Sequence, residues 1–379
     1  MKHLFCVSAA LSLCLTGCVT PDTPSPRVPS YAAFSTDVTP MASAPLADDK
    51  VLTRIAFGSC NRETNDQTIW TTIKAENPDL FLFLGDNVYG DPWTSDPLFA
   101  DPTMPKMRES YNTLAKSEQF ASLRQDVPVM TTWDDHDYGV NDGGAEYLYK
   151  DLSQALYLDA WNVAADDERR ARDGIHTSRI VGPVGKRVQI ILLDTRFFRT
   201  YLQVTDERGV PGKERYVPLE GPHGTMLGEA QWDWLKAELQ KPADVRLIAS
   251  SIQVIADGHG WEAWRTMPHE RERFYDLIEQ TNAKGVVLLS GDRHARSIYR
   301  RDDVVDYPLY EVTASSLNVP IRSLLDPANT EPEEAGPHRL HPMQYNPNYG
   351  LIDIDWDARN VTLTVASPEG GDFVNTVEF

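Results

Sequence analysis

The sequence predicts an α/β protein whose central strands are parallel and buried on both faces. Short continuous apolar runs recur along the chain, and Gly, Pro or polar residues bound each of them. Patterns of helical periodicity lie between several of these runs. Strands that alternate with helices are typical of a parallel sheet covered by helices. A chain of 379 residues, 41% of them hydrophobic, is long enough to bury a sizeable core.

Each expected element follows from its local pattern. Residues 66–76 are predicted to be helical, because Ile69, Trp70 and Ile73 share one face and Asn77-Pro78 ends the pattern. Further helices are predicted at residues 106–124, 232–239 and 268–283. Buried strands are predicted at residues 51–57, 80–84, 127–133, 187–193, 245–250 and 286–290. From residue 295 onward the pattern is mostly β, with strands at 297–299, 309–313, 351–356, 361–366 and 373–379.

The N-terminus has the form of a bacterial lipoprotein signal. Lys2 precedes an apolar segment, residues 4–15, that is too short to span a bilayer, and Leu15-Thr16-Gly17-Cys18 follows it. We expect residues 1–17 to be removed as a signal peptide and Cys18 to carry a lipid. Residues 18–50 would form a linker with six prolines that connects the anchor to a domain of residues 51–379. The expected location is the cell envelope, on its periplasmic or cell-surface face.

Charge and cysteine content narrow the possible functions. The formal net charge of −20 argues against specific nucleic-acid binding, because such proteins need a basic surface. The acid excess contributes to solubility, and it leaves open that some carboxylates bind cations. Cys6 and Cys14 would leave with the signal peptide, so Cys60 would be the one free thiol of the mature chain. The simplest interpretation of Cys60 is a small buried apolar residue.

Polar clusters follow four of the predicted strands. They are Gly58-Ser59-Cys60, the segment 85–89, the segment 134–137 and the segment 291–294. Ligands of open α/β sheets bind outside the carboxyl ends of the strands, so we expect these clusters to meet. The clusters and the residues just after them supply the candidate ligands Cys60, Asp86, Tyr89, Asp135, His136, Asn141, Asp292 and His294.

These residue types favour a metal-dependent hydrolase. Carboxylate and amide oxygens suit Ca²⁺, whereas thiolate, phenolate and imidazole suit a transition metal such as Fe³⁺. Cations grouped at a sheet edge would clamp phosphoryl oxygens and activate water as hydroxide. Two alternatives place Cys60 as a nucleophile. A cysteine phosphatase needs Arg six positions later, where this chain has Asp66, and a Cys60–His136 dyad would leave the carboxylates unexplained.

Taken in order, these motifs resemble those of the PhoD-like alkaline phosphatases, a branch of the calcineurin-like metallophosphoesterases. The motifs are GSC, GDNVYGD, WDDHDYGVND and SGDRH, together with LLDTRFFR and NYGLIDID. The resemblance covers roughly residues 51–379. It implies a four-layer αββα sandwich with two mixed β-sheets flanked by helices, and a site with one Fe³⁺ and one or two Ca²⁺.

The resemblance also implies roles for individual residues. Cys60, Asp86 and Tyr89 would bind the iron, while Asp86, Asn141 and Asp292 would bind calcium. Arg293 would face the phosphate. Asp135 and His136 take the place of the Asn and His of the wider superfamily's GNH motif, and residues 291–294 take the place of its GHxH motif. The implied catalytic residues are therefore His136, Arg293 and His294, with Asp135 beside the metals.

Other features are less specific. His259 and Trp261 are candidates for the substrate pocket, although a structural loop is an equally good interpretation of this segment. Asp194, Arg196 and Arg199 are expected to support the site rather than to react. The long segments 200–228 and 324–349 lack regular periodicity, and loops of that length are often lids. Some members of the family end in a helix over the site, whereas residues 373–379 are strand-like, so a more open site is expected.

The sequence therefore predicts an exported, lipid-anchored phosphoesterase that acts on phosphate mono- or diesters. Two alternatives stay open. One is a phospholipase-type diesterase that acts on membrane lipids, which tethering at Cys18 would suit. The other is a calcium-binding surface lipoprotein without catalysis, although structural calcium sites do not use a thiol.

Overall fold

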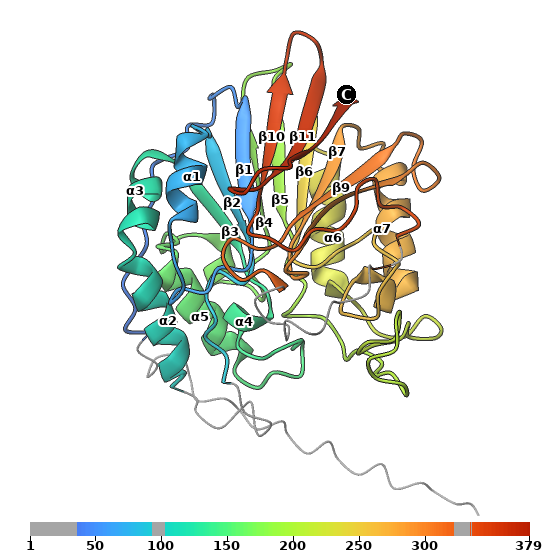
Figure 1. The fold of residues 1–379 in the computed structure, drawn as a ribbon, viewed down its shortest axis with the longest axis horizontal. Coiled ribbons are helices and arrows are strands. Elements are labelled where there is room, and N and C mark those ends of the chain that lie inside the picture. Colours follow the sequence, from blue (N-terminus) through green and yellow to red (C-terminus); the bar gives the residue numbers. More distant parts are fainter. Residues whose placement is uncertain (1–35, 93–102, 322–333, 335) are drawn as a thin grey trace, which may run out of the picture. The chain divides into compact units, whose positions relative to one another are not determined.

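The computed structural model describes residues 36–92, 103–321, 334 and 336–379. Two six-stranded sheets form the centre of this region (Figure 1). The first sheet has the order β12-β11-β10-β1-β2-β3, in which β1, β2 and β3 are parallel and the other neighbours are antiparallel. Its strands are β1 (Arg54–Gly58), β2 (Leu80–Leu84), β3 (Val129–Thr132), β10 (Tyr349–Asp355), β11 (Asn360–Ala366) and β12 (Phe373–Glu378).

The second sheet has the order β4-β5-β6-β7-β9-β8. Strands β5, β6, β7 and β9 are parallel, and the edge strands β4 and β8 are antiparallel to their neighbours. Its strands are β4 (Thr177–Val181), β5 (Val188–Leu192), β6 (Val245–Ser250), β7 (Val286–Ser290), β8 (Arg296–Arg301) and β9 (Leu309–Ala314).

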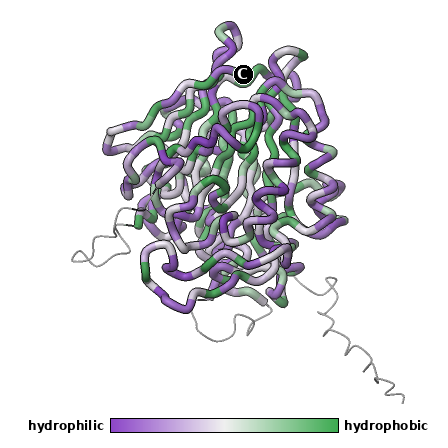
Figure 2. The backbone as a smooth tube through the Cα atoms, turned by 90° about the vertical axis from the view of Figure 1, so that its right-hand side faces the viewer, coloured by the Kyte–Doolittle hydropathy of each residue, from purple (hydrophilic) through white to green (hydrophobic). Residues whose placement is uncertain are grey.

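The two sheets pack face to face. Alternate residues of their strands, such as Leu82 of β2 and Leu247 of β6, belong to one buried cluster, and both are inaccessible to solvent. Alternate residues share this cluster because successive side chains of a strand point to opposite faces of the sheet. Figure 2 shows the result, with hydrophobic segments in the interior and hydrophilic ones outside.

Helices cover the outer faces of both sheets (Figure 1). On the first sheet, Trp70 of α1 contacts Phe81 and Phe83 edge-on. On the second, Phe274 of α7 packs in a cluster that includes Ile248 of β6. The order helix, sheet, sheet, helix is the predicted αββα sandwich. The helices are α1 (Ile69–Ala75), α2 (Pro105–Ala115), α3 (Glu118–Asp126), α4 (Asp135–Tyr138), α5 (Lys150–Ala160), α6 (Gly228–Leu239) and α7 (Pro268–Gln280), with 3-10 turns at Glu168–Arg170 and Trp264–Thr266.

The sequence patterns failed to predict three of the elements and merged two helices into one. The periodicity did not predict β4, α4 or α5. The stretch predicted as one helix at 106–124 is divided into α2 and α3, because Ser117 caps the second helix and accepts a hydrogen bond from the backbone N–H of Phe120. The C-terminal strand is confirmed as β12.

The described end of the predicted linker packs on the domain. Met41 and Leu46 are buried, and the backbone N–H of Met41 donates to the carbonyl of Ala160. Described residues before position 51 are thus part of the packed structure, because burial of these apolar side chains is favourable. The predicted signal peptide and Cys18 lie outside the described residues. Within the described residues, none of the helices has the length and apolar character needed to cross a membrane.

Candidate metal centre

The four predicted polar clusters meet at one end of the sandwich. The loop after β1 runs beside the loop after β2, with the N–H of Asn61 donating to the carbonyl of Asp86 (2.9 Å). The loop after β9 reaches across from the second sheet, with the N–H of Leu317 donating to the carbonyl of Ser59 (2.9 Å). Strand ends of both sheets therefore build a single site.

Three overlapping groups of possible metal ligands lie in this site. In each group the ligand atoms lie within 4.8 Å of one another. Asp86 belongs to two of the groups and Asp135 to two, so the groups form a continuous chain. Among the described residues they are Cys60–Asp86–His294, Asp86–Asp135–His136, and Asp134–Asp135–Asp292.

The backbone at these positions adopts a conformation that most residues avoid. Cys60, Asp86, Asp292 and His294 all have positive φ, between 49° and 66°. A non-glycine residue in this region is uncommon and costs on the order of 1–3 kcal/mol, which the surrounding structure must offset. Four such residues within one cluster indicate that the loops are held for the site rather than for stability.

Close backbone approach between loops explains a glycine of the SGDRH motif. The N–H of Gly291 donates to the carbonyl of Ser251 (2.9 Å). A Cβ atom at position 291 would lie 2.6 Å from Ser59 Oγ and 2.9 Å from that carbonyl. The loop after β7 can approach the loop after β1 so closely only because residue 291 has no side chain.

Cys60 is fully buried at the end of β1. Its sulfur lies 3.4 Å from Asp86 Oδ2 and 3.3 Å from the hydroxyls of Ser59 and Ser315. Burial raises the pKa of the Cys60 thiol to about 12. Without a cation the group is thus a neutral thiol, and an adjacent metal ion is the means by which it would become a thiolate ligand.

The carboxylates are crowded and incompletely satisfied. Burial raises the pKa of Asp86, of Asp134 and of Asp292, and neighbouring negative charges add to the effect. Asp86 Oδ1 and Asp134 Oδ2 are buried and have no hydrogen-bond partner among the described residues. Such oxygens carry a desolvation cost that a bound cation would remove. The residues present therefore fit metal ions.

Two histidines and a tyrosine border the carboxylates. The Nδ1–H of His136 donates to Asp91 (2.9 Å), which orients its ring, while that of His294 donates to the carbonyl of Val319. The Tyr89 hydroxyl lies 3.3 Å from Asp86 Oδ2 and 3.3 Å from His294 Nε2. Burial lowers the pKa of His136, but the carboxylates of Asp135, Asp86 and Asp91 outweigh it and raise that pKa well above its usual range.

Comparisons with known proteins identify the family to which this geometry belongs. A family model described as PhoD-like phosphatase matches residues 55–365. The chain belongs to the PhoD-like phosphatase family. Alkaline phosphatase D of Bacillus subtilis (strain 168) is 25% identical over 274 residues, which cover 63% of this chain and 45% of that protein. The chain thus matches less than half the length of this curated relative. A solved structure of PhoD superposes with a TM-score of 0.63 at 16% identity, covering 88% of this chain and 70% of that one, which supports the shared fold.

In this PhoD-like protein, two residues that support the site were not predicted from the sequence. The buried Asp137 carboxylate accepts from the N–H groups of Asp86, Asn87 and Asp134, and so holds two motif loops together. Asp91 orients His136 in the same region. Both residues lie inside the family motifs GDNVYGD and WDDHDYGVND, and that position in the sequence could have indicated a role at the site.

Arg196 contacts two carboxylates next to the candidate ligands of the PhoD-like site. Its fully buried guanidinium pairs with Asp134 and, at 2.6 Å, with Glu262. Arg199 pairs with the other oxygen of Glu262 at 3.0 Å. The network fixes Asp134 behind the ligand groups and links the loops after β3, β5 and β6.

The remaining predicted residues are placed less centrally. Arg293 is buried and pairs with Glu334 at 3.0 Å, while its guanidinium carbon lies 5.9 Å from the ring centre of Trp261. His259 uses both ring nitrogens within its loop, at 2.9 Å from Gln253 Oε1 and 3.1 Å from the N–H of Trp261, which favours a structural role. Asn141 is exposed, and its role as a calcium ligand stays a prediction.

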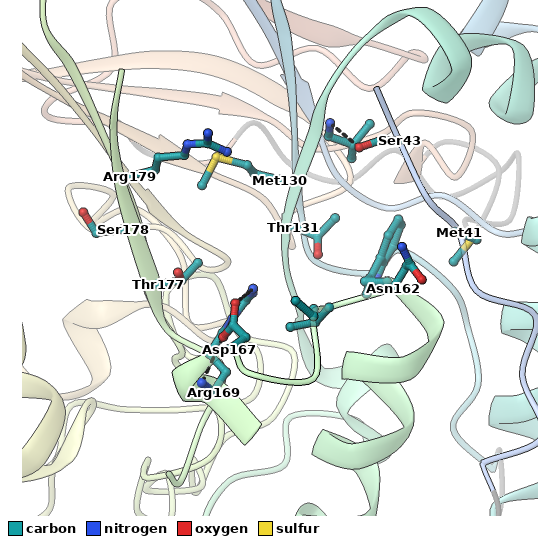
Figure 3. Close-up of a pocket in the computed structure, with 14 residues that line it drawn as sticks. Met41, Ser43, Met130, Thr131, Asn162, Asp167, Arg169, Thr177, Ser178 and Arg179 are labelled. Carbon is teal, nitrogen blue, oxygen red and sulfur yellow. Dashed lines mark hydrogen bonds and ion pairs between the residues drawn. The ribbon is translucent and has the colours of Figure 1, made fainter. Parts of the chain in front are cut away.

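A separate cavity of about 380 Å³ lies between the edge strands β3 and β4. Thr131, Asn162, Thr177 and the Asp167–Arg169 pair line it, as Figure 3 shows. None of the candidate ligands of the PhoD-like site lines this cavity, so it is distinct from the metal centre.

Proposed function

We propose that this chain is an exported, metal-dependent phosphoesterase that hydrolyses phosphate mono- or diesters. The observation that carries the proposal is the continuous chain of ligand groups joined by Asp86 and Asp135. Membership of the PhoD-like phosphatase family and the similarity to alkaline phosphatase D support the reaction class. Because the match covers 45% of that relative, the substrate must be tested on this chain directly.

The donor types suggest how metal ions would be distributed. Cys60, Asp86 and Tyr89 offer sulfur, carboxylate and phenol groups, which suit Fe³⁺. Asp292, with Asp134 and Asp135, offers the oxygen donors that suit one or two Ca²⁺ ions. Ions in this cluster would supply positive charge toward phosphoryl oxygens and make a nucleophile available near neutral pH.

The protein's own groups would orient and protonate the substrate. Arg293, whose guanidinium pairs with Glu334 at 3.0 Å, would bind non-bridging phosphoryl oxygens. His136, whose ring is oriented by Asp91, would hold a proton for the leaving oxygen. His294 is held by Val319 with Nε2 toward Tyr89, at the edge of the ligand groups.

A phospholipase-type diesterase is a second candidate. Three exposed apolar side chains favour it, since Tyr201, Val204 and Val210 are 62%, 63% and 44% exposed on the segment that borders the site. Side chains of this kind can enter the headgroup region of a bilayer. Hydrolysis of phosphatidylcholine vesicles at a rate comparable to that of a soluble diester would favour this candidate.

The test combines metal analysis with hydrolysis. Purified protein should contain iron and calcium, and should hydrolyse p-nitrophenyl phosphate or its bis-ester. A calcium-selective chelator should abolish turnover, and added Ca²⁺ should restore it. Asp292→Asn should lose activity, whereas Asp303→Asn, which alters an exposed acid paired with Arg301, should not. A metal-containing protein that hydrolyses no ester would instead support the calcium-binding lipoprotein without catalysis.

The proposed location has its own test. We propose that Cys18 carries the lipid that anchors the protein in the cell envelope. Cys18→Ala should yield protein that is unprocessed or found in the soluble fraction. Mature Cys18→Ala protein that still fractionates with membranes would contradict the proposal.

A further inference from the structure

A hairpin within the long segment after β5 docks beside the metal centre. Residues 203–217 form it, with antiparallel bridges between Val204 and Tyr216 and between Val210 and Lys213. Its outer part, residues 206–211, is exposed, whereas residues 212–217 are partly buried. The hairpin therefore has a solvated tip and a base that contacts the rest of the domain.

The base is attached to the Trp261 segment through the backbone. The N–H groups of Arg215 and Tyr216 both donate to the carbonyl of Gly260, at 3.1 and 2.7 Å. The N–H of Gly260 donates in return to the Glu214 carboxylate. The Arg215 guanidinium then lies over the Trp261 ring, 5.1 Å from its centre. Arg293 lies near the same ring at 5.9 Å, so two arginines lie close to Trp261.

Asp142 connects this base to the metal centre. Its backbone N–H donates to Oδ2 of the candidate ligand Asp135 (2.8 Å). Its carboxylate accepts from the Tyr216 hydroxyl (2.7 Å) and pairs with Arg215. One residue thus touches a metal ligand through its main chain and the hairpin through its side chain.

Resting on the proposed phosphoesterase function, we propose that Asp142 is a positioning residue that holds hairpin 203–217 over the mouth of the site. In that position Arg215 and Trp261 contact the ester group beyond the scissile phosphate, so the hairpin selects diesters over small monoesters. Exposure supports the division of roles. The Arg215 side chain is 27% exposed, whereas the Arg293 side chain is 6% exposed.

Two substitutions remove side-chain contacts of the hairpin without changing any candidate metal ligand. Asp142→Asn keeps the size and the backbone N–H, and Asn tolerates the φ of 52° found there, but it removes the charge that pairs with Arg215. Tyr216→Phe removes only the hydroxyl that donates to Asp142. Arg208→Gln, at the exposed tip of the same hairpin, is the matched control.

Steady-state kinetics with p-nitrophenyl phosphate and bis(p-nitrophenyl) phosphate form the test. Asp142→Asn and Tyr216→Phe should raise KM for the diester by about tenfold, the effect of losing a hydrogen bond to a charged group, with a much smaller change in its kcat. KM for the monoester should change little, and iron and calcium content should stay at wild-type levels. Arg208→Gln should match the wild type throughout.

The outcomes distinguish the two proposals. Equal losses on both substrates, or loss of metal together with activity, would mean that Asp142 serves the metal centre and would overturn the hairpin proposal. If the wild type binds its metals but hydrolyses neither ester, the proposed function fails instead. Trypsin cleavage of the hairpin then tests the attachment alone, since both variants should be cut faster at Arg208 than the wild type.

Discussion

At the scale of single residues, the site is built from side chains in environments that suit cations and little else. Cys60 is a buried thiol beside a buried carboxylate, and its backbone φ is 59°. Asp86 has one carboxylate oxygen near Cys60 and Tyr89, while the other has no partner among the described residues. The cysteine is therefore better explained as a ligand than as an apolar core residue.

Replacement of Cys60 by Ser tests this interpretation. The change keeps the size but offers an oxygen that is harder and far less acidic. We expect the variant to fold normally, to lose iron, and to lose at least about a thousandfold in kcat, which corresponds to about 4 kcal/mol. Pure wild-type protein should also be coloured by charge transfer from thiolate and phenolate to Fe³⁺, and the variant colourless. Wild-type iron content and kcat in folded Cys60→Ser would show that the thiol is only a core residue.

At the scale of elements, buried polar and charged side chains connect the loops that follow the strands. Asp137 joins the loop after β2 to that after β3 through three backbone N–H groups. Arg196, from the loop after β5, joins Asp134 to Glu262. Buried ion pairs contribute little net stability, but removal of one partner is costly because the other charge stays buried. These contacts fix geometry more than they add stability.

Arg196→Gln should therefore be strongly destabilising. The substitution leaves the buried carboxylates of Asp134 and Glu262 without their shared cation, which we expect to cost about 3–5 kcal/mol in free energy of unfolding. Arg300→Gln is the control, since Arg300 and Asp302 pair at the surface with side chains 39% and 60% exposed, and its cost should stay below about 1 kcal/mol. Urea denaturation of both variants measures the difference. Similar small losses would indicate that the buried network does not hold the loops.

At the scale of the whole molecule, the two sheets are complementary parts of one site. The first sheet supplies Cys60, Asp86 and Asp135 from adjacent parallel strands, and the second supplies Asp292 from β7. The group Asp134–Asp135–Asp292 combines residues that follow strands of both sheets. The face-to-face packing of the sheets is thus what brings the acidic groups together, at an electrostatic cost that metal ions would offset.

Stability should consequently depend on pH and metal together. In the metal-free protein, burial raises the pKa of Asp86 and Asp292 well above the ordinary 3.8, so the folded state binds protons more tightly than the unfolded state. This contribution is fully present below the ordinary value and is lost as the pH rises through the raised values. As the pH rises through the raised pKa values, the Tm of the chelated protein should fall further below that of the metal-loaded protein. The reason is that bound cations stabilise the folded state. Asp292→Asn should reduce the difference in Tm between the metal-loaded and the chelated protein. A Tm difference that does not change with pH would contradict the expectation.

The sequence by itself predicted most of the strands and the residue types that gather at the site. Continuous apolar runs located β2, β6 and β7 to the residue, because strands buried on both faces need no polar positions. The motifs at their ends identified Cys60, Asp86, Asp135, His136, Asp292 and His294, which the structure brings together, since parallel strands in one sheet end at the same edge.

Only the tertiary structure decided which neighbours support these residues. Asp91, Asp137 and Asp142 contact partners distant in sequence, and no local periodicity encodes such contacts. The same reason explains why His259 pairs within its own loop and why Asn141 is exposed rather than clustered. Hydrogen bonds and ion pairs between loops depend on how closely the two sheets pack, and that distance is a property of the complete core.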